Sequence, residues 1–375
     1  RELNIEHIIE GQKNHFLRRK KFQTNKSLYI GEELTIAEPG PGEIKVRLAA
    51  CAICHSDVTL AEGGWGGELP AVYGHEASGI VESIGAGVSE AKPGDHVVVT
   101  LIRSCGSCHY CSQDIETQCD ASFHLDANSP LSGSGDEAVS QGLNTGAFAE
   151  QVVVEQSQVC VIPKDIPLDS ASILACGVLT GFGAVTNTAA IKPGSQVAVM
   201  GCGGVGINSI QGAVHCEASR IIALDLLDEK LELARQFGAT HTVNSTDQNA
   251  AQQVINLSEG RGVDYLFVTV GAKSAIEQSL GMLAKGGTAV IVGMPASGVM
   301  AQYDPGEFAA AGQSIIGSKM GSASVSRDIP ELVKLYQAGS LKLDELISGR
   351  YALDDINDAI ASVQRGEALR NVVIF

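Results

Sequence analysis

Two patterns of hydrophobic and polar positions divide the chain. Up to about residue 175, short apolar stretches alternate with turns rich in glycine and proline, which is typical of β-strands. We expect strands at 43–48, after Pro39-Gly40-Pro41-Gly42, and at 96–99, after Pro93-Gly94-Asp95. The first pattern therefore predicts a β-rich, barrel-like unit.

From about residue 178 the pattern changes to strands that alternate with helices. Residues 196–200 form an apolar run, as expected of a strand that is buried on both faces. The alternation indicates a doubly wound parallel sheet. Its further elements are expected as strands at 220–225, 265–270 and 288–292 and a helix at 228–237. The tail predicts helices around 330–338 and 354–364 and a last strand at 371–375, which we expect to rejoin the first unit.

Length and charge narrow the possible functions. A chain of 375 residues exceeds what one hydrophobic core usually serves, so we expect two domains. The net charge of −17 disfavours nucleic acid and membranes as partners. The basic run Arg18-Arg19-Lys20-Lys21 is interpreted as a solvated edge strand, with a nucleic-acid or targeting role as the alternative. No stretch resembles a signal peptide or a transmembrane helix, and we expect a soluble, cytoplasmic protein.

A glycine-rich sequence predicts a nucleotide site. Gly201-Cys202-Gly203-Gly204-Val205-Gly206 matches G-x-G-x-x-G and follows the strand at 196–200. Such glycines permit a tight turn and let a pyrophosphate approach a helix N-terminus. Asp225 ends the next strand, where its carboxylate would bind ribose hydroxyls and repel a 2′-phosphate, so NAD is favoured over NADP. The alternative is an ordinary strand-to-helix turn with a surface aspartate.

Four closely spaced cysteines predict a metal site. Cys105, Cys108, Cys111 and Cys119 lie within fifteen residues at spacings typical of metal ligation. Four thiolates saturate a tetrahedral zinc ion and leave no open position, so this site is predicted to be structural. An iron–sulfur cluster, which also uses four cysteines, is the alternative.

A second group of possible zinc ligands is dispersed. Cys54 follows a strand, the pair His75-Glu76 comes next, and Cys176 lies near the domain boundary. Two cysteines and one histidine leave the fourth zinc position open, as catalysis requires. Spacing alone does not select Cys176. Each of these residues by itself is more often a buried thiol or a hydrogen-bonded histidine.

The other cysteines are interpreted as packing residues. Cys51 and Cys54 could form a redox C-x-x-C pair, but the strand–helix context of such pairs is missing. We interpret Cys160, Cys202 and Cys216, like Cys51, as packing residues.

Together these motifs resemble those of the zinc-containing alcohol dehydrogenases of the medium-chain dehydrogenase/reductase family, over nearly the whole chain. The most specific is Gly74-His75-Glu76-Ala77-Ser78-Gly79, followed by Gly85 and Val88, which fits the family's zinc signature. Segment 105–119 resembles the structural-zinc lobe, 176–181 the stretch that brings the third catalytic ligand, and 366–370 the family's C-terminus.

The resemblance implies an α/β fold in which a Rossmann domain (178–323) interrupts a GroES-like, β-rich catalytic domain (1–177 and 324–375) with a zinc lobe at about 103–120. It implies two zinc ions per chain and NAD as cofactors. Cys54, His75 and Cys176 would bind the catalytic zinc, with Glu76 able to approach it during ligand exchange. The implied cofactor contacts are His55, Thr180, Gly201, Gly203, Gly204, Val205, Gly206, Asp225, Lys230, Val270, Val292 and Arg370.

The resemblance also implies a reaction. Zinc would act as a Lewis acid on the alcohol, Ser56 would take the proton, and hydride would pass to NAD⁺. Asp57 would hold a zinc ligand by accepting a hydrogen bond. Leu101 and Phe148 would line the substrate pocket with Trp65 nearby, which favours an apolar aliphatic, aromatic or allylic primary alcohol. The polar segment 121–146 resembles an insertion of dimeric relatives, so we expect a homodimer, with a tetramer as the alternative.

Three features depart from the family pattern. Thr59 stands where many relatives have a histidine that completes the proton relay. The N-terminus carries about sixteen residues before the expected first strand, and the loop Gly63-Gly64-Trp65-Gly66-Gly67 is unusual. These departures leave the substrate class open.

The sequence disfavours four other functions. A thiol-dependent formaldehyde dehydrogenase would need cationic or polar groups for the carboxylates of the thiol, and none is evident near the predicted pocket. Polyol dehydrogenases commonly replace the cysteine at the position of Cys176. A catalytically inactive, zinc-stabilised nucleotide-binding protein is disfavoured because all three expected zinc ligands, Ser56 and the nucleotide motif are retained. A zinc-dependent nucleic-acid binder is disfavoured by the charge of −17.

Overall fold

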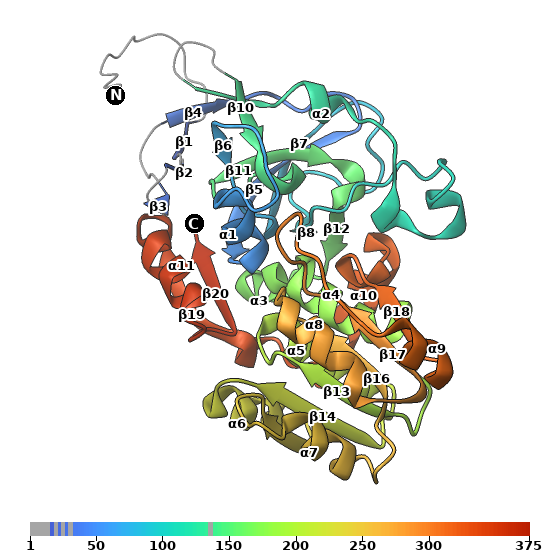
Figure 1. The fold of residues 1–375 in the computed structure, drawn as a ribbon. Helices are drawn as coiled ribbons and strands as arrows, with labels where there is room; N and C mark the ends of the chain where they lie inside the picture. Colours follow the sequence, from blue (N-terminus) through green and yellow to red (C-terminus); the bar gives the residue numbers. More distant parts are fainter. Residues whose placement is uncertain (1–15, 19–21, 24–26, 29–32, 134–137) are drawn as a thin grey trace.

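A computed structural model describes residues 33–133 and 138–375, together with short strand segments at 16–18, 22–23 and 27–28. It has a β-rich part and a part in which strands and helices alternate (Figure 1). One hydrophobic cluster includes buried residues of both parts, among them Val98, Leu179 and Val199. The two parts are therefore held together by a continuous core.

The β-rich part is built around a seven-stranded sheet. Its order is β12-β8-β7-β5-β20-β19, and β11 also pairs with β5. The antiparallel register of β5 with β7 places Ala52 opposite Glu76. The last strand, β20, pairs with β5, so the tail rejoins the first part as predicted. The strands are β5 (Glu43–Ala52), β7 (Glu76–Ile84), β8 (His96–Val99), β11 (Gln151–Glu155), β12 (Val159–Ile162), β19 (Ile347–Ala352) and β20 (Arg370–Ile374).

A five-stranded sheet of order β1-β4-β9-β10-β6 completes this part. Arg18 ends β1, an edge strand, whereas residues 19–21 of the basic run lie outside the described residues. The polar segment 121–146 has secondary structure of its own within its described residues. It forms a short helix and two strands that are too brief for periodicity to reveal. The elements are β1 (Phe16–Arg18), β4 (Glu33–Ile36), β6 (Ala71–Val72), α2 (His124–Ala127), β9 (Leu131–Ser132) and β10 (Ala138–Gln141), beside the separate pair β2 (Phe22–Gln23) and β3 (Ser27–Leu28).

The second part contains a six-stranded, all-parallel sheet. Its order is β15-β14-β13-β16-β17-β18, which is the Rossmann order. The predicted doubly wound sheet is confirmed. Its strands are β13 (Gln196–Met200), β14 (Arg220–Asp225), β15 (His241–Asn244), β16 (Val263–Val268), β17 (Leu283–Ile291) and β18 (Ser314–Gly317). Its helices are α5 (Gly204–His215), α6 (Asp228–Gln236), α7 (Ala250–Leu257), α8 (Lys273–Ser279) and α9 (Pro305–Ala311).

Five further α-helices complete the described fold, and one of them, α4, packs on α5 of the second part. α4 packs so closely on α5 that a Cβ at Gly181 would lie 2.1 Å from the carbonyl oxygen of Val205. These helices are α1 (His55–Ala61), α3 (Leu168–Ser172), α4 (Gly177–Gly183), α10 (Val325–Gln337) and α11 (Ile356–Gln364). Within the described residues, no single helix is long and apolar enough to span a bilayer. Only the two helical segments 168–175 and 177–188, which are bent against each other, meet both criteria when taken together.

Several element boundaries differ from those predicted: β5 continues to Ala52, β17 already begins at Leu283, and α10 and β16 have other limits. α10 begins five residues before Pro330, because the Asp328 carboxylate accepts the Ser324 amide (2.9 Å) and secures an earlier first turn. β16 ends at Val268 rather than at Val270. A Cβ at Gly293 would lie 2.3 Å from the backbone of Val270, so the chain after β17 crosses there and ends the pairing.

Candidate metal and cofactor sites

Cys54, His75, Glu76 and Cys176 form a buried cluster. Their ligand atoms all lie within 4.8 Å of one another. The pairing of β5 with β7 brings Cys54, just after one strand, beside His75, just before the other. Thr100, which follows β8, donates from Oγ1 to the carbonyl of the residue before Cys176 (2.7 Å). Two neighbouring strands and this hydrogen bond thus assemble residues that lie far apart in the sequence.

Asp57 orients this cluster from α1. Its Oδ1 lies 2.9 Å from Nδ1 of His75 and accepts the amide of Gly74 (3.0 Å), while Oδ2 accepts the amide of Cys54 (3.2 Å). The buried His75 Nε2 has no hydrogen-bond partner among the described residues. This arrangement fits a histidine that donates from Nδ1 to a carboxylate and offers the Nε2 lone pair to a metal.

The charges of the cluster also fit a cation. The contact with Cys176 lowers the pKa of the Cys54 thiol against the effect of burial, and the same contact, together with burial, raises the pKa of Cys176. Burial raises the pKa of Glu76 to about 7, although Arg370 opposes the shift. The opposite shifts of Cys54 and Cys176 mean that the two adjacent thiols do not both ionise unless a cation lies beside them. Two sulfurs and one imidazole nitrogen are a donor set that zinc prefers.

Arg370 occupies a space that two glycines leave open. A Cβ at Gly177 would lie 1.9 Å from its Nη2, and a Cβ at Gly204 would lie 2.5 Å from its Nε. Its Nη1 lies 3.5 Å from the Glu76 carboxylate and 3.4 Å from the carbonyl of Ile53. Its buried Nε and Nη2 have no partner in the described part of the chain. These unused donors, at the start of α5, fit an anionic group such as a pyrophosphate.

The glycine-rich turn has the geometry that its sequence predicts. Gly201 adopts φ +96°, which favours glycine, and a Cβ at Gly206 would lie 1.7 Å from the Gly201 carbonyl oxygen. Gly203 and Val205 flank the first residue of α5, and no atom lies within 4 Å of a Cβ built on Gly203. The turn thus leaves room for a ligand at the helix N-terminus.

Asp225 ends β14 beside this turn. Its Oδ2 accepts the amide of Cys202 (2.7 Å), and its Oδ1 accepts the amide of Leu226 (2.8 Å). The carboxylate is thereby fixed in orientation, with lone pairs left for ribose hydroxyls. The other implied cofactor contacts are Lys230 on α6, Thr180 on α4, exposed His55 at the start of α1, Val270 after β16 and buried Val292 after β17.

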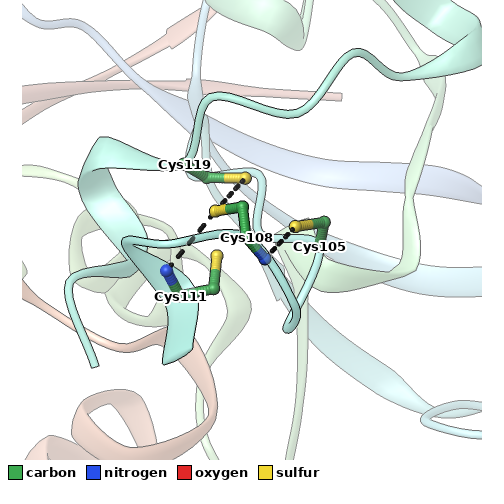
Figure 2. A group of neighbouring side chains, drawn as sticks. All are labelled: Cys105, Cys108, Cys111 and Cys119. Carbon is green, nitrogen blue, oxygen red and sulfur yellow. Dashed lines mark hydrogen bonds between the residues drawn. The ribbon is translucent and has the colours of Figure 1, made fainter. Parts of the chain in front are cut away.

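Cys105, Cys108, Cys111 and Cys119 converge in a separate lobe. Figure 2 shows the four side chains converging from different sides of the lobe, and their sulfurs all lie within 4.8 Å of one another. The amide of Cys108 donates to the Cys105 sulfur (3.2 Å), and the amide of Cys111 donates to the Cys108 sulfur (3.4 Å). Backbone amides lower the pKa of Cys105 to about 6, whereas burial raises that of Cys111 to about 12. Four converging sulfurs fit a closed tetrahedral zinc site.

Of the remaining cysteines, Cys51 lies beside the first cluster, where its thiol contacts the backbone of His75 and Glu76, and Cys160, Cys202 and Cys216 belong to neither cluster. All ten cysteines of the chain are free thiols. Burial raises the pKa of Cys51 and of Cys202, and it raises that of Cys160 to about 12. Burial also raises the pKa of the partly exposed Cys216. Such thiols are unreactive, which agrees with a packing role.

The three residues assigned to the substrate pocket lie in different surroundings. Leu101 lines a cavity of about 180 Å³ beside the metal lobe. Phe148 is only 1% exposed and packs in the core of the β-rich part. Trp65 reaches the other part of the molecule, where its Nε1 donates to the carbonyl of Pro295 (3.0 Å). Beside it, the amide of Ser297 donates to the carbonyl of Gly64 (2.9 Å).

Met320 is a neighbour of the cluster that the sequence did not reveal. Its sulfur lies 3.7 Å from the Cys176 sulfur and 3.5 Å from the Thr180 hydroxyl. No spacing rule links residues that are 144 positions apart. The only available signal was the small residues Gly317-Ser318 and 321–324 on either side of Lys319 and Met320, which mark a turn but not its location.

Comparison with known proteins identifies the family of the chain. Residues 40–164 match the family model "Alcohol dehydrogenase GroES-like domain", and residues 204–338 match "Zinc-binding dehydrogenase". The chain is 35% identical to an NDMA-dependent alcohol dehydrogenase of Amycolatopsis methanolica, covering 92% of this chain and 94% of the relative. It is 36% identical to a probable S-(hydroxymethyl)glutathione dehydrogenase of Schizosaccharomyces pombe, covering 91% and 92%. The crystal structure of benzyl alcohol dehydrogenase from Acinetobacter calcoaceticus is 31% identical, with a TM-score of 0.90 over 96% of this chain and 99% of that one.

Proposed function

Because the chain belongs to the zinc-containing alcohol dehydrogenases of the medium-chain dehydrogenase/reductase family, we propose that it interconverts a primary alcohol and its aldehyde with NAD. The alcohol carries an aliphatic, aromatic or allylic group. The family, the two sulfur-rich clusters and the glycine-rich turn support zinc and NAD as cofactors. Residues 178–323 are proposed as the NAD-binding domain, and 1–177 with 324–375 as the catalytic domain.

The observation that carries this proposal is the unpartnered His75 Nε2, buried between the sulfurs of Cys54 and Cys176. An unpaired buried nitrogen is costly unless it meets a ligand. When bound, zinc would polarise the alcohol oxygen and NAD would take up the hydride. Cys54, His75 and Cys176 hold the metal, and Glu76 provides a carboxylate that can approach it. Asp57 keeps the imidazole in the orientation that this requires.

Ser56 is proposed to carry the proton. Its hydroxyl lies 3.5 Å from the Cys54 sulfur at the border of the cluster and is partly exposed. A hydroxyl both accepts and donates, so it can take the proton of the alcohol and pass it on. The next residue, His55, is exposed to solvent. We propose that His55 or water performs the last step, since Thr59 cannot replace the histidine of relatives.

We propose the contacts with NAD from the charges of the side chains near the glycine-rich turn. Arg370 offers two unused donors to the pyrophosphate, and Asp225 offers its carboxylate to the ribose hydroxyls. Lys230 lies on the helix that follows Asp225, within reach of the same nucleotide end. A 2′-phosphate beside Asp225 would be repelled, which favours NAD over NADP. We also propose a cytoplasmic location, which suits ten free thiols.

A thiol-dependent formaldehyde dehydrogenase is the second candidate. The name of the Schizosaccharomyces pombe relative motivates it. The sequence showed no cation near the expected pocket, yet Arg103 and Lys319 line the cavity that also contains Leu101. Carboxylates of a thiol adduct could therefore find a counter-charge beside the cluster.

The test is NADH formation from NAD⁺ across a panel of apolar primary alcohols, polyols, and formaldehyde with and without thiols. We expect turnover of the apolar primary alcohols, and Cys54→Ser should abolish it together with one of two zinc ions. Cys160→Ala, which removes a buried thiol on β12 outside both clusters, is the matched control and should keep both zinc ions. Activity only with formaldehyde plus a thiol would select the second candidate. Protein that holds two zinc ions and binds NADH, yet oxidises nothing in the panel, would refute both.

A further inference from the structure

A cavity of about 230 Å³ lies between α4, the end of α5 and α10, and it has no role in the proposal above. None of its lining residues belongs to either sulfur-rich cluster or to the proposed contacts with NAD. Its apolar wall consists of Leu179 and Phe182 of α4 and Leu332 and Leu335 of α10. A cavity of roughly 150 Å³ accommodates a benzene molecule, so this one can take an aromatic ring with a short substituent.

Another wall of the cavity is an unusual turn. Residues 184–188, which follow α4, form a π-helix, a rare conformation that occurs frequently at functional sites. Two side chains of this turn, Thr186 and Asn187, line the cavity. The Thr186 hydroxyl donates to the carbonyl of Phe182 (3.2 Å), and Asn187 donates from Nδ2 to the Asp328 carboxylate (2.9 Å). These two bonds tie the turn to α4 and to α10, so the wall is held in place.

The charges at the cavity are of one sign. Among the described residues, its lining includes the carboxylates of Asp328 and Glu331 and no lysine or arginine. Asp328 is already engaged by Arg327 (2.8 Å) and Asn187. Glu331 pairs through Oε1 with Lys334 (2.6 Å), but its Oε2 has no partner in the described part of the chain. Because both side chains of that pair are exposed and such pairs are weak, Glu331 can accept a second cation. The lining therefore favours a cationic ligand over an anionic one.

His215, the last residue of α5, adds an aromatic face and an acceptor. Its ring centroid lies 5.2 Å from that of Phe182. The residue is exposed, and neither ring nitrogen forms a hydrogen bond within the described residues. A neutral imidazole has one nitrogen that accepts, so it can receive an N–H of a ligand. Aromatic faces also attract ammonium ions.

We propose that this cavity is a binding site, separate from the zinc and NAD sites, for a small organic cation: an ammonium group joined to one aromatic ring by a short chain. The ring would lie against Phe182 and Leu332, and the ammonium would donate to the free oxygen of Glu331 and to His215. A carboxylate of the same size would meet like charges instead. The site requires neither zinc nor NAD, so it does not depend on the proposed function.

The test measures binding of 2-phenylethylamine to the zinc- and NADH-loaded enzyme by calorimetry. We expect a single site with a dissociation constant on the order of 0.1 to 1 mM, the range open to so small a ligand. Ethylamine lacks the ring, and 3-phenylpropanoate carries a carboxylate in place of the ammonium. Each should bind at least about tenfold more weakly, because one loses the apolar burial and the other meets like charges. Added salt should also weaken binding of 2-phenylethylamine.

Variants of the lining locate the bound amine. Thr186→Phe places a ring in the cavity and should remove binding, whereas Glu331→Gln should weaken it up to about fivefold, the scale of an exposed ion pair. Glu232→Gln is the matched control, because Glu232 forms the same i,i+3 pair with Arg235 on α6 and does not line the cavity. Cys54→Ser, which should lose the catalytic zinc, should bind the amine unchanged.

Equal binding of the amine and the carboxylate would overturn the site, and so would binding that is unchanged in both Thr186→Phe and Glu331→Gln. Loss of binding in Cys54→Ser alone would place the amine at the metal cluster and would also overturn it. Retained NADH binding shows that Thr186→Phe folds. If it does not fold, the three ligands and Glu331→Gln still decide the outcome.

Discussion

At the scale of the residue, the carboxylate of Asp57 serves three groups at once: the amides of Cys54 and Gly74 and the ring of His75. Its charge also acts on its neighbour. Burial alone would lower the pKa of His75, but the charge and hydrogen bond of Asp57 outweigh burial and leave that pKa well above its usual value. One buried aspartate thus sets both the position and the basicity of a proposed metal ligand.

Asp57→Asn should therefore weaken zinc binding at the catalytic cluster. An amide keeps most of the shape but removes the charge, and loss of such a supporting partner typically costs 10- to 100-fold in metal affinity. Competition with a chelator, followed by zinc analysis, measures the change. Asp247→Asn, at an exposed position after β15, is the control and should retain both zinc ions. Unchanged zinc affinity in Asp57→Asn would show that backbone contacts alone orient His75.

Single residues also show where sequence-based prediction ends. The role of Gly201 and Gly206 in the turn could be predicted because the strand, the turn and the helix follow one another directly in the sequence. The contact between Met320 and Cys176 could not, because only the folded chain brings them together. Trp65 was expected near the alcohol, yet its indole N–H bonds a carbonyl across the junction of the two parts. The cavity cation Lys319 was missed for the same reason, since no motif surrounds it.

At the scale of the element, the lobe at 105–119 depends on its four sulfurs. Its short 3-10 turns bury few side chains, with Cys111 and Thr117 as the buried residues. Binding of a structural zinc ion supplies folding free energy to such a segment directly. The lobe is also tied to the start of α10, because the Ser324 hydroxyl donates to Glu116 (2.7 Å).

Cys111→Ala should consequently reduce the zinc content from two ions per chain to one and lower the melting temperature by several degrees. NADH binding should persist, because the glycine-rich turn and Arg370 lie in other elements. Metal analysis, thermal unfolding and NADH fluorescence provide the three readouts. Cys216→Ala, which removes a partly exposed thiol after α5, is the control. Retention of two zinc ions by Cys111→Ala would contradict the four-cysteine site.

Elements were predictable to different degrees. Strands β8, β13 and β14 occur at the predicted residues because each is a single apolar run between clear turns. Helix α10 was predicted too short because Pro330 suggested a first turn, and the hydrogen bond from Ser324 to Asp328 has no sequence signature of comparable strength. Strands β9 and β10 were missed because two to four residues cannot show a period.

At the scale of the whole molecule, β18 is an edge strand of the parallel sheet and leaves one row of backbone groups unpaired within the described residues. Ile315 on this strand is 40% exposed. Exposed apolar edges are rare in monomers, because they invite pairing with another chain. We propose that two copies pair through β18 to form a symmetric homodimer.

Light scattering should accordingly give twice the mass of one chain, and Ile315→Lys should yield monomers that retain the fold. A lysine on an edge strand opposes pairing. The matched variant is Val161→Lys, an exposed apolar residue on β12 at the edge of the other sheet, which should remain dimeric. Dissociation by Val161→Lys alone would assign the interface to the β-rich part instead.

The contact of Trp65 with Pro295 has an optical consequence. Trp65 is the only tryptophan in the chain, so its emission originates at one known place, between the loop after α1 and the chain after β17. The protein thus carries a built-in reporter at the junction of its two parts. Any shift of that emission on adding nucleotide is a direct record of whether the junction opens or tightens, without a label.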